Sequence, residues 1–345
     1  MWRRQIVVAV AFGLACLAVK AVWVEAGKPP APPPTPCTTC AIAYVLGGNY
    51  NRQDLMLMNE DGSSKTLLLA GAKLLWHNDP AWSPDGGWIA FDSNMNNHTG
   101  LYVIRNDGTG MTEVAPRCSA SPNNYRWDGP SWQPDGLGGW YWVVYADRRV
   151  PNGTCGDHLN LWAVEVGLGS SVSVGRSVWL AGTDDAQWVE AAWSGNGTHL
   201  AARHIPIDGL DASQIFVFDV GFTSDGVPYL ENPWSLTPPG LEGQIRGPSW
   251  AHWSDSLVAA VGTELWRCDV DFIQHAYTWT NLAPGSDYTF TSPRFSGDDS
   301  QIVFDGARPV NRPREAGIYV VTLSPFSIQL IATGNFGVHL PDWRR

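Results

Sequence analysis

The chain has 345 residues, of which 44% are hydrophobic and 12% are aromatic, so it is long enough and apolar enough to bury a large core. Its formal net charge is −11 and its pI is near 5.1. This acidic balance argues against nucleic-acid binding, which requires a basic surface.

The first 26 residues have the pattern of a signal peptide. A basic leader, Trp2-Arg3-Arg4, precedes an apolar stretch at residues 6–19 that is short for a membrane span. Val24-Glu25-Ala26 offers a cleavage point before Gly27. We expect export to the periplasm, the cell envelope or the extracellular space, with residues 1–26 either removed or retained as a membrane anchor. Residues 27–39 are rich in proline and predict an extended linker.

One short motif then recurs six times. Each copy is a brief strand that begins with Pro or Ala and ends in an aromatic residue, and the aromatic residues are Trp82, Trp132, Trp193, Trp250, Phe295 and Trp343. Trp82 and Trp343 are 261 residues apart over five intervals, which gives a period of about 52 residues. A period of this length indicates an array of supersecondary units, each unable to bury its apolar face alone.

Each unit reads as four β-strands. In the first unit, residues 80–83 form a strand, Ser83-Pro84-Asp85-Gly86 a tight turn, residues 87–93 a mostly apolar return strand, and Asn106-Asp107-Gly108 a second hairpin turn. No sustained helical period appears after residue 26. Four-stranded units at this spacing predict an all-β fold, a β-propeller, with two packed β-sandwiches as the alternative.

The two ends of the chain predict how the ring closes. Residues 41–47 resemble a second strand without its first, and residues 54–59 resemble a third strand. Residues 339–343 resemble a first strand without its partners. We therefore predict that residues 40–345 form a six-bladed β-propeller whose last blade is shared by both termini.

These motifs resemble the WD40-like (PD40) repeat of the TolB family, whose units read roughly Leu-Tyr-x-x-x-x-Asp-Gly and then Pro-x-Trp-Ser-Pro-Asp-Gly-x-x-Ile-Ala-Phe. Residues 54–62, 80–91, 101–108 and 293–304 carry the resemblance most closely, and it covers about residues 40–345. It implies a TolB-like propeller, with an envelope role and lipoprotein partners as one special case. TolB carries an α/β domain before its propeller, and residues 1–39 do not resemble one. The third and fourth units also lack the Ser-Pro-Asp-Gly turn, so those blades are expected to diverge.

Five cysteines lie beyond the leader. Cys118 and Cys155 flank the first two strands of the second unit and are predicted to form a disulfide across one end of it. Cys37 and Cys40 are favoured as a local disulfide, with free thiols, a redox pair or half of a zinc site as alternatives. Cys268, inside a predicted strand, is expected to be a buried thiol.

The chain contains 19 tryptophans, and most of them are expected to fill the space between neighbouring blades. Exposed ones are candidates for stacking against a carbohydrate. Trp127, Trp188 and Trp234 are the tryptophans that we expect to be exposed in this way.

The two faces of a propeller differ in their loops. Turns after the first and third strands of each unit lie on one face, and here they are short and formulaic. Links into the first strand and loops between the second and third strands lie on the other face, where they are long and varied. Binding residues usually lie on loops of a rigid scaffold, so this variable face and the channel mouth are the predicted binding site. Its candidate residues are His77, Asp79, Tyr125, Arg126, Asp185, Gln187, His204, Gln244, Arg246, Tyr288, Arg312 and His339.

Two classes of function remain open. No Gly-x-Ser-x-Gly elbow, Walker loop, dinucleotide fingerprint, EF-hand loop or His-Glu-x-x-His motif is present. The favoured hypothesis is a monomeric, non-enzymatic binding module without a cofactor, which binds a protein segment or a glycan and meets a membrane only through its leader. The alternative is a propeller-type enzyme such as a metal-dependent polysaccharide lyase or hydrolase. By analogy with lyases built on this repeat, His77, His204 and His339 would then hold the metal.

Overall fold

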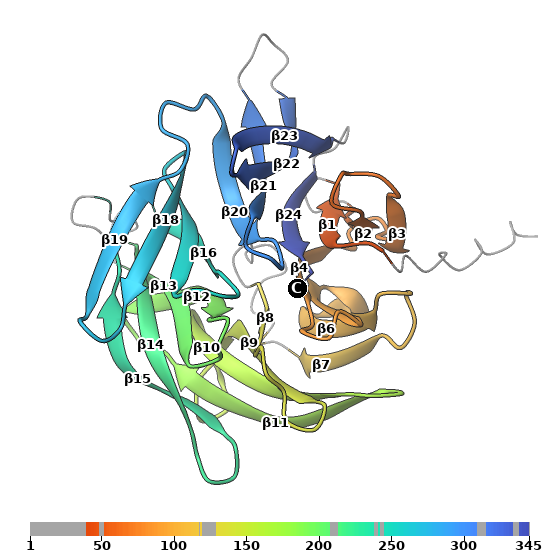
Figure 1. The fold of residues 1–345 in the computed structure, drawn as a ribbon. Helices are drawn as coiled ribbons and strands as arrows, with labels where there is room; N and C mark the ends of the chain where they lie inside the picture. Colours follow the sequence, from red (N-terminus) through yellow and green to blue (C-terminus); the bar gives the residue numbers. More distant parts are fainter. Residues whose placement is uncertain are drawn as a thin grey trace, which may run out of the picture. The chain divides into compact units, whose positions relative to one another are not determined.

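The protein is described by a computed structural model over residues 39–47, 52–116, 118, 129–207, 213–237, 241, 245–308, 315–333 and 338–344. These residues form six four-stranded antiparallel β-sheets, arranged as the blades of a β-propeller (Figure 1). The all-β, six-bladed fold predicted from the repeat is confirmed, and the alternative of two packed sandwiches is wrong.

In five blades the strands follow the chain from the centre outward. Blade 1 contains β4 (His77–Trp82), β5 (Trp88–Ser93), β6 (Gly100–Arg105) and β7 (Thr112–Pro116), with the 3-10 helix η1 (Met95–Asn97) after β5. Blade 2 contains β8 (Ser131–Trp132), β9 (Trp140–Arg149), β10 (Cys155–Leu168) and β11 (Val172–Ala181). Blade 3 contains β12 (Ala186–Trp193), β13 (His199–Pro206), β14 (Gln214–Phe222) and β15 (Pro228–Ser235). Blade 4 contains β16 (Ile245–Trp250), β17 (Ser256–Val261), β18 (Glu264–Asp271) and β19 (Ala276–Asn281). Blade 5 contains β20 (Thr289–Phe295), β21 (Gln301–Arg308), β22 (Glu315–Leu323) and β23 (Phe326–Ala332).

Blade 6 joins the two ends of the described chain. It contains β24 (Val338–Trp343), β1 (Ile42–Leu46), β2 (Asp54–Met58) and β3 (Thr66–Leu69) in that order. β24 pairs antiparallel with β1, so that Trp343 lies opposite Ile42 and Asp342 opposite Ala43 (Figure 1). β24 therefore takes the innermost position that β4 takes in blade 1, and the predicted shared blade is confirmed.

The core lies between blades rather than within them. Each of the six larger hydrophobic clusters joins two neighbouring blades. One cluster places Trp88 and Val103 of blade 1 against Trp132 of blade 2, and another places Leu57 of blade 6 against Phe91 of blade 1. Because one sheet cannot cover both of its own apolar faces, each blade depends on its two neighbours for burial.

In blades 1, 3 and 5 the turn after the inner strand is fixed by hydrogen bonds from a serine side chain. In blade 1, Ser83 Oγ donates to Asp85 Oδ1 at 2.6 Å and accepts from Trp88 N at 2.9 Å, and Gly86 has a φ of 64°. Blade 3 keeps the same turn although its sequence departs from the motif: Ser194 Oγ donates to Asn196 Oδ1 at 2.7 Å. An Asn oxygen accepts this bond as an Asp oxygen does, so the expected divergence of blade 3 does not change its turn.

Blade 2 carries a disulfide between Cys118 and Cys155, with the two Cα atoms 5.6 Å apart. Cys40 is also disulfide-bonded, and its partner lies outside the described residues, so the Cys37–Cys40 pair stays a prediction. Cys268 is a buried free thiol on β18, where burial raises the pKa of the thiol.

Truncation after Val338 tests the closure of the ring. The shortened chain lacks most of β24, including Trp343, which is buried between blades 5 and 6. We expect the free energy of unfolding to fall by several kcal/mol, about the cost of a large core truncation or more, because the wedge between two blades loses its inner strand. Thermal and urea unfolding measure the change, with removal of Arg345 alone as the control. An unchanged melting temperature would contradict the closure through β24.

Removal of the Cys118–Cys155 disulfide tests its contribution to stability. The bond closes a loop with a sequence separation of 37 residues. Loop-closure entropy then predicts that C118S/C155S lowers the free energy of unfolding by about 3–4 kcal/mol. Urea unfolding measures the loss, and intact-mass measurement with and without reductant reports whether the wild-type bond is present. A double variant as stable as the oxidised wild type would contradict the prediction.

Candidate binding site at the central channel

The inner strands share an unusual backbone feature. In five blades the residue just before the Pro or Ala of the motif has a left-handed backbone, with φ between 47° and 64°, and these residues are Asp79, Glu190, Gly247, Ser292 and Leu340. The pairing register of each of these inner strands shifts at the same place, as a β-bulge does. A left-handed backbone costs about 1 kcal/mol or more for a residue with a Cβ, so only a constrained strand keeps it.

At the junction of blades 3 and 4 the bulge directs a charged side chain across to the next blade. Glu190 Oε2 accepts a hydrogen bond from Gly247 N at 2.7 Å, and Glu190 Oε1 lies 3.3 Å from the Arg203 guanidinium. Arg203 also donates to Ser213 Oγ at 3.2 Å. The two charged side chains are only 13% and 8% exposed, so their partners fix them firmly in place.

Arg246 directly precedes Gly247 on β16 and lies next to this network. Its side chain is half-buried, and its Nε is shielded from solvent without a hydrogen-bond partner among the described residues. A guanidinium does not lose its proton near neutral pH, and a buried donor without a partner is costly. An oxygen acceptor on a ligand would satisfy this donor.

Three further candidates lie in the same sector. The ring of His204 contacts that of Trp188, with centroids 4.7 Å apart, and Phe216 lies 5.5 Å away. Burial lowers the pKa of His204, while the charge of Asp185 opposes this shift. Asp185 is exposed just before β12, and Gln187 pairs with Ile205 on β13. The structure thus brings Asp185, Gln187, His204 and Arg246 to blades 3 and 4.

The remaining described candidates lie elsewhere. Tyr288 of blade 5 packs against Tyr319, with centroids 5.2 Å apart, and Arg308 lies over its ring at 5.5 Å. Asp79 of blade 1 faces blade 2, where a Cβ on Gly129 would be 3.7 Å from its own Cβ. Four candidates, Tyr125, Arg126, Gln244 and Arg312, lie outside the described residues. Of His339 only the backbone is described, paired with Val45.

Two assignments made from the sequence need correction. His77 is fully buried and hydrogen-bonded to Ser93 Oγ at 3.0 Å, so it is a packing residue that a ligand does not reach. Trp188 is only 7% exposed and Trp234 is half-buried among Phe272, His275 and Tyr277, so neither offers a free stacking face. In both cases the alternation of side chains along a strand indicates the face of the sheet on which a residue lies. It does not indicate whether the neighbouring blade covers that face.

The sequence did not single out Arg203, although it lies at the centre of the blade 3–4 network. An arginine in an otherwise apolar strand, His-Leu-Ala-Ala-Arg-His-Ile-Pro, is the signal that could have found it, because a buried charge requires a partner.

The channel has a second mouth on the face of the short turns. A small cavity of about 90 Å³ there is lined by the motif tryptophans of several blades and by the Arg294–Asp342 ion pair, whose closest atoms are 3.7 Å apart. Asp342 also accepts a hydrogen bond from Trp82 N at 2.7 Å, which ties blade 6 to blade 1.

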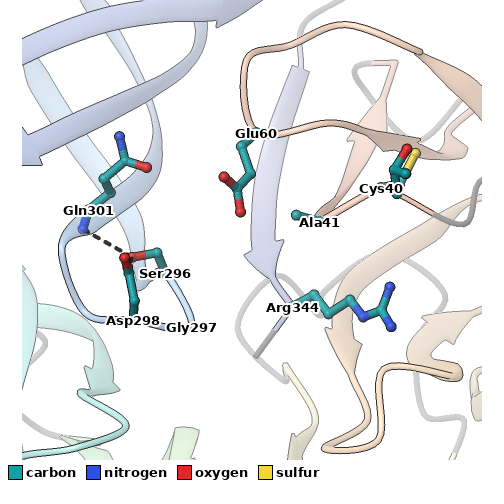
Figure 2. Close-up of a pocket in the computed structure, with 9 residues that line it drawn as sticks. Cys40, Ala41, Glu60, Ser296, Gly297, Asp298, Gln301 and Arg344 are labelled. Carbon is teal, nitrogen blue, oxygen red and sulfur yellow. Dashed lines mark hydrogen bonds between the residues drawn. The ribbon is translucent and has the colours of Figure 1, made fainter.

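A larger cleft of about 380 Å³ lies beside this mouth, between blades 5 and 6 (Figure 2). Ser296, Gly297, Asp298 and Gln301 form one wall, and Glu60 and Arg344 lie on the other (Figure 2). Sequence reasoning missed this cleft because its two walls come from opposite ends of the chain and meet only in the closed ring.

Within the described part of the chain, no three His, Cys, Asp or Glu side chains are placed to hold a metal ion. Of the histidines considered from the sequence, His77 is buried and bonded to Ser93, which removes it from such a set, and the side chain of His339 lies outside the described part of the structure. The same residues include no helix that is long and apolar enough to cross a membrane.

Comparison with known proteins identifies the fold. No known family of sequences matches the chain, and no curated protein does. TolB from Acinetobacter baumannii is similar in structure, with a TM-score of 0.56, 18% identity, and coverage of 88% of this chain and 66% of that one. A putative TolB from Agrobacterium tumefaciens has a TM-score of 0.54 and 16% identity, and the match covers 87% of this chain and 91% of that one.

Other functions occur on the same fold. Hydrazine synthase from Kuenenia stuttgartiensis has a TM-score of 0.58 and 11% identity. The match covers 88% of this chain and 46% of the hydrazine synthase chain. The chain therefore has the propeller fold that TolB proteins have, and it spans slightly less than two thirds of the Acinetobacter protein. At these identities the likeness shows the fold alone.

The buried histidine predicts an acid-dependent loss of stability. Burial lowers the pKa of His77 to about 4 from 6.5, so the neutral form is favoured in the folded state. A depressed histidine pKa contributes stability that is complete above pH 6.5 and is lost as the pH falls toward 4, by up to about 3 kcal/mol. Urea unfolding of wild type and H77Q between pH 7 and 4 should show a shallower pH dependence in the variant. Parallel curves would contradict the assignment.

Proposed function

We propose that this chain is an exported, non-catalytic binding module that holds a segment of a partner protein at the variable end of its channel. The signal-like leader supports export, and the propeller fold shared with TolB proteins supports a scaffold function. The compartment expected is the periplasm, the cell envelope or the extracellular space.

The half-buried guanidinium of Arg246 is the observation that carries this proposal. Its shielded Nε has no partner among the described residues, whereas neighbouring Glu190 and Arg203 are paired with each other. Because this donor is already desolvated and lies on a β-strand, little free energy is needed to desolvate or order it when a ligand binds. This favours a high affinity. Arg246 would donate to a carboxylate or backbone carbonyl of the partner segment.

The surrounding groups supply specificity. Asp185 is exposed and negative, Gln187 can donate and accept, and His204 is held by Trp188. Gln187 and His204 lie on the paired strands β12 and β13, and both strands contact β16, which carries Arg246. An extended segment could therefore contact these side chains together with Arg246. The untested members of the candidate set, Tyr125, Arg126, Gln244, Arg312 and His339, would extend this surface around the channel.

Substitution of Arg246 tests the proposal. Co-purification with the tagged chain identifies the partner, and calorimetry then compares wild type with R246A. Loss of a charge-assisted hydrogen bond should weaken binding about 10-fold or more, with little change in melting temperature. R267A is the matched control, because Arg267 is an arginine of the same blade that forms a surface ion pair with Asp269. Equal weakening by R246A and R267A would contradict the assignment of the binding end.

A further inference from the structure

Trp253 is an exposed aromatic side chain that is nevertheless held in one orientation. It lies in the turn between β16 and β17 of blade 4 and is 81% exposed. Its indole Nε1 donates to Gly297 O and its backbone N to Asp299 Oδ2, both at 2.9 Å. The only polar atom of the side chain is therefore already bonded, and what remains exposed is the flat apolar surface of the ring.

The turn that holds Trp253 is itself fixed. Asp299, on blade 5, also accepts from the backbone N and from Nδ1 of His252 at 2.9 Å. Burial opposes ionisation of Asp299, but the hydrogen bonds from His252 and Trp253 outweigh it and lower the pKa of the carboxyl group. Two neighbouring blades thus share one carboxylate, and rotation of Trp253 would break the bond to Gly297.

Gly297 connects Trp253 with the cleft between blades 5 and 6. The carbonyl that accepts from the indole belongs to the turn whose Ser296, Gly297 and Asp298 form one wall of the cleft (Figure 2). The cleft volume of about 380 Å³ lies within the range of small-molecule sites, about 300–1,000 Å³.

The cleft walls present hydrogen-bond acceptors with free capacity. Asp298 is held by Ser296 and Ser300, whose hydrogen bonds lower its pKa, so it is ionised and can still accept. Glu60 accepts a hydrogen bond from Trp343 Nε1 at 3.3 Å. Gln301 Nε2 donates to Thr322, and its Oε1 can accept. Arg344 also lines the cleft, but its guanidinium lies over the ring of Trp82 in blade 1 and points away from the opposite wall (Figure 2).

We propose that Trp253 and this cleft form a saccharide-binding site for a neutral oligosaccharide with equatorial hydroxyl groups. The flat apolar face of one pyranose ring stacks on Trp253, and the hydroxyls of the next ring bond to Asp298, Glu60 and Gln301. The carboxylates of Asp298 and Glu60 line the cleft, whereas the guanidinium of Arg344 lies over Trp82, so an acidic sugar is disfavoured. The site lies on the face of the short turns, at the opposite end of the channel from Arg246, and it does not depend on the protein-segment site.

Calorimetry with the full chain and defined trisaccharides tests this proposal. Cellotriose and tri-N-acetylchitotriose are the neutral probes, and trigalacturonate is the acidic one, each up to about 10 mM. We expect saturable binding of at least one neutral probe and weaker or no binding of trigalacturonate. W253A should weaken binding at least about 10-fold, W253F should retain most of it, and D298N should weaken it without changing the stacking ring.

Leu137→Ala is the matched control. Leu137 is 88% exposed on the short-turn face of blade 2, away from the cleft, so its loss should leave saccharide binding unchanged. As a second test, the partition of wild type and both variants into phosphatidylcholine vesicles is measured. If W253A and L137A both reduce partition into vesicles and no trisaccharide binds, the exposed side chains insert into lipid and the proposal is overturned. Binding of a trisaccharide that W253A leaves intact would also overturn it.

Discussion

The ring closure is the constraint on which the rest of this structure depends. Each four-stranded sheet has two apolar faces, and the six main hydrophobic clusters bury them only between one blade and the next. An open array would leave two faces exposed to water. The pairing of β24 with β1 removes both open ends at once, because it supplies the inner strand of blade 6 and places Trp343 against blade 5.

A second consequence of the ring is the polar lining near its axis. In five blades the residue before the Pro or Ala of the inner strand has a left-handed backbone, and the strand bends there as at a β-bulge. In blade 3 that residue is Glu190, which bonds to Gly247 of blade 4 and pairs with Arg203. In blade 6 the left-handed residue is Leu340, and Asp342, two residues further along the strand, accepts a hydrogen bond from Trp82 N of blade 1. Side chains at or near this bend thus link blades through hydrogen bonds, and the Nε donor of Arg246 beside it has no partner among the described residues.

Local turn chemistry explains why blades with different motifs have similar shapes. Ser194 and Asn196 reproduce the bonds that Ser83 and Asp85 make, so blade 3 keeps the short turn without Pro or Asp. Gly195 stands where the motif has Pro, because a Cβ there would lie 2.3 Å from the carbonyl oxygen of His252 in blade 4. Blade 4 differs: its turn bonds to Asp299 of blade 5 and presents Trp253 to solvent.

The sequence by itself determined the number of blades, the order of strands within each blade, and the closure by both ends of the chain. These follow from a period of about 52 residues and from period-2 apolar patterns, which are local properties of the chain. Only the tertiary structure decided which polar residues are accessible. His77 is buried, and Arg203 of β13 pairs with Glu190 of the neighbouring strand β12. The walls of the cleft, at Glu60 and Asp298, come from blades 6 and 5. The alternation along a strand assigns each side chain to a face of its own sheet, whereas accessibility depends on the neighbouring blade, which lies tens to hundreds of residues away in the chain.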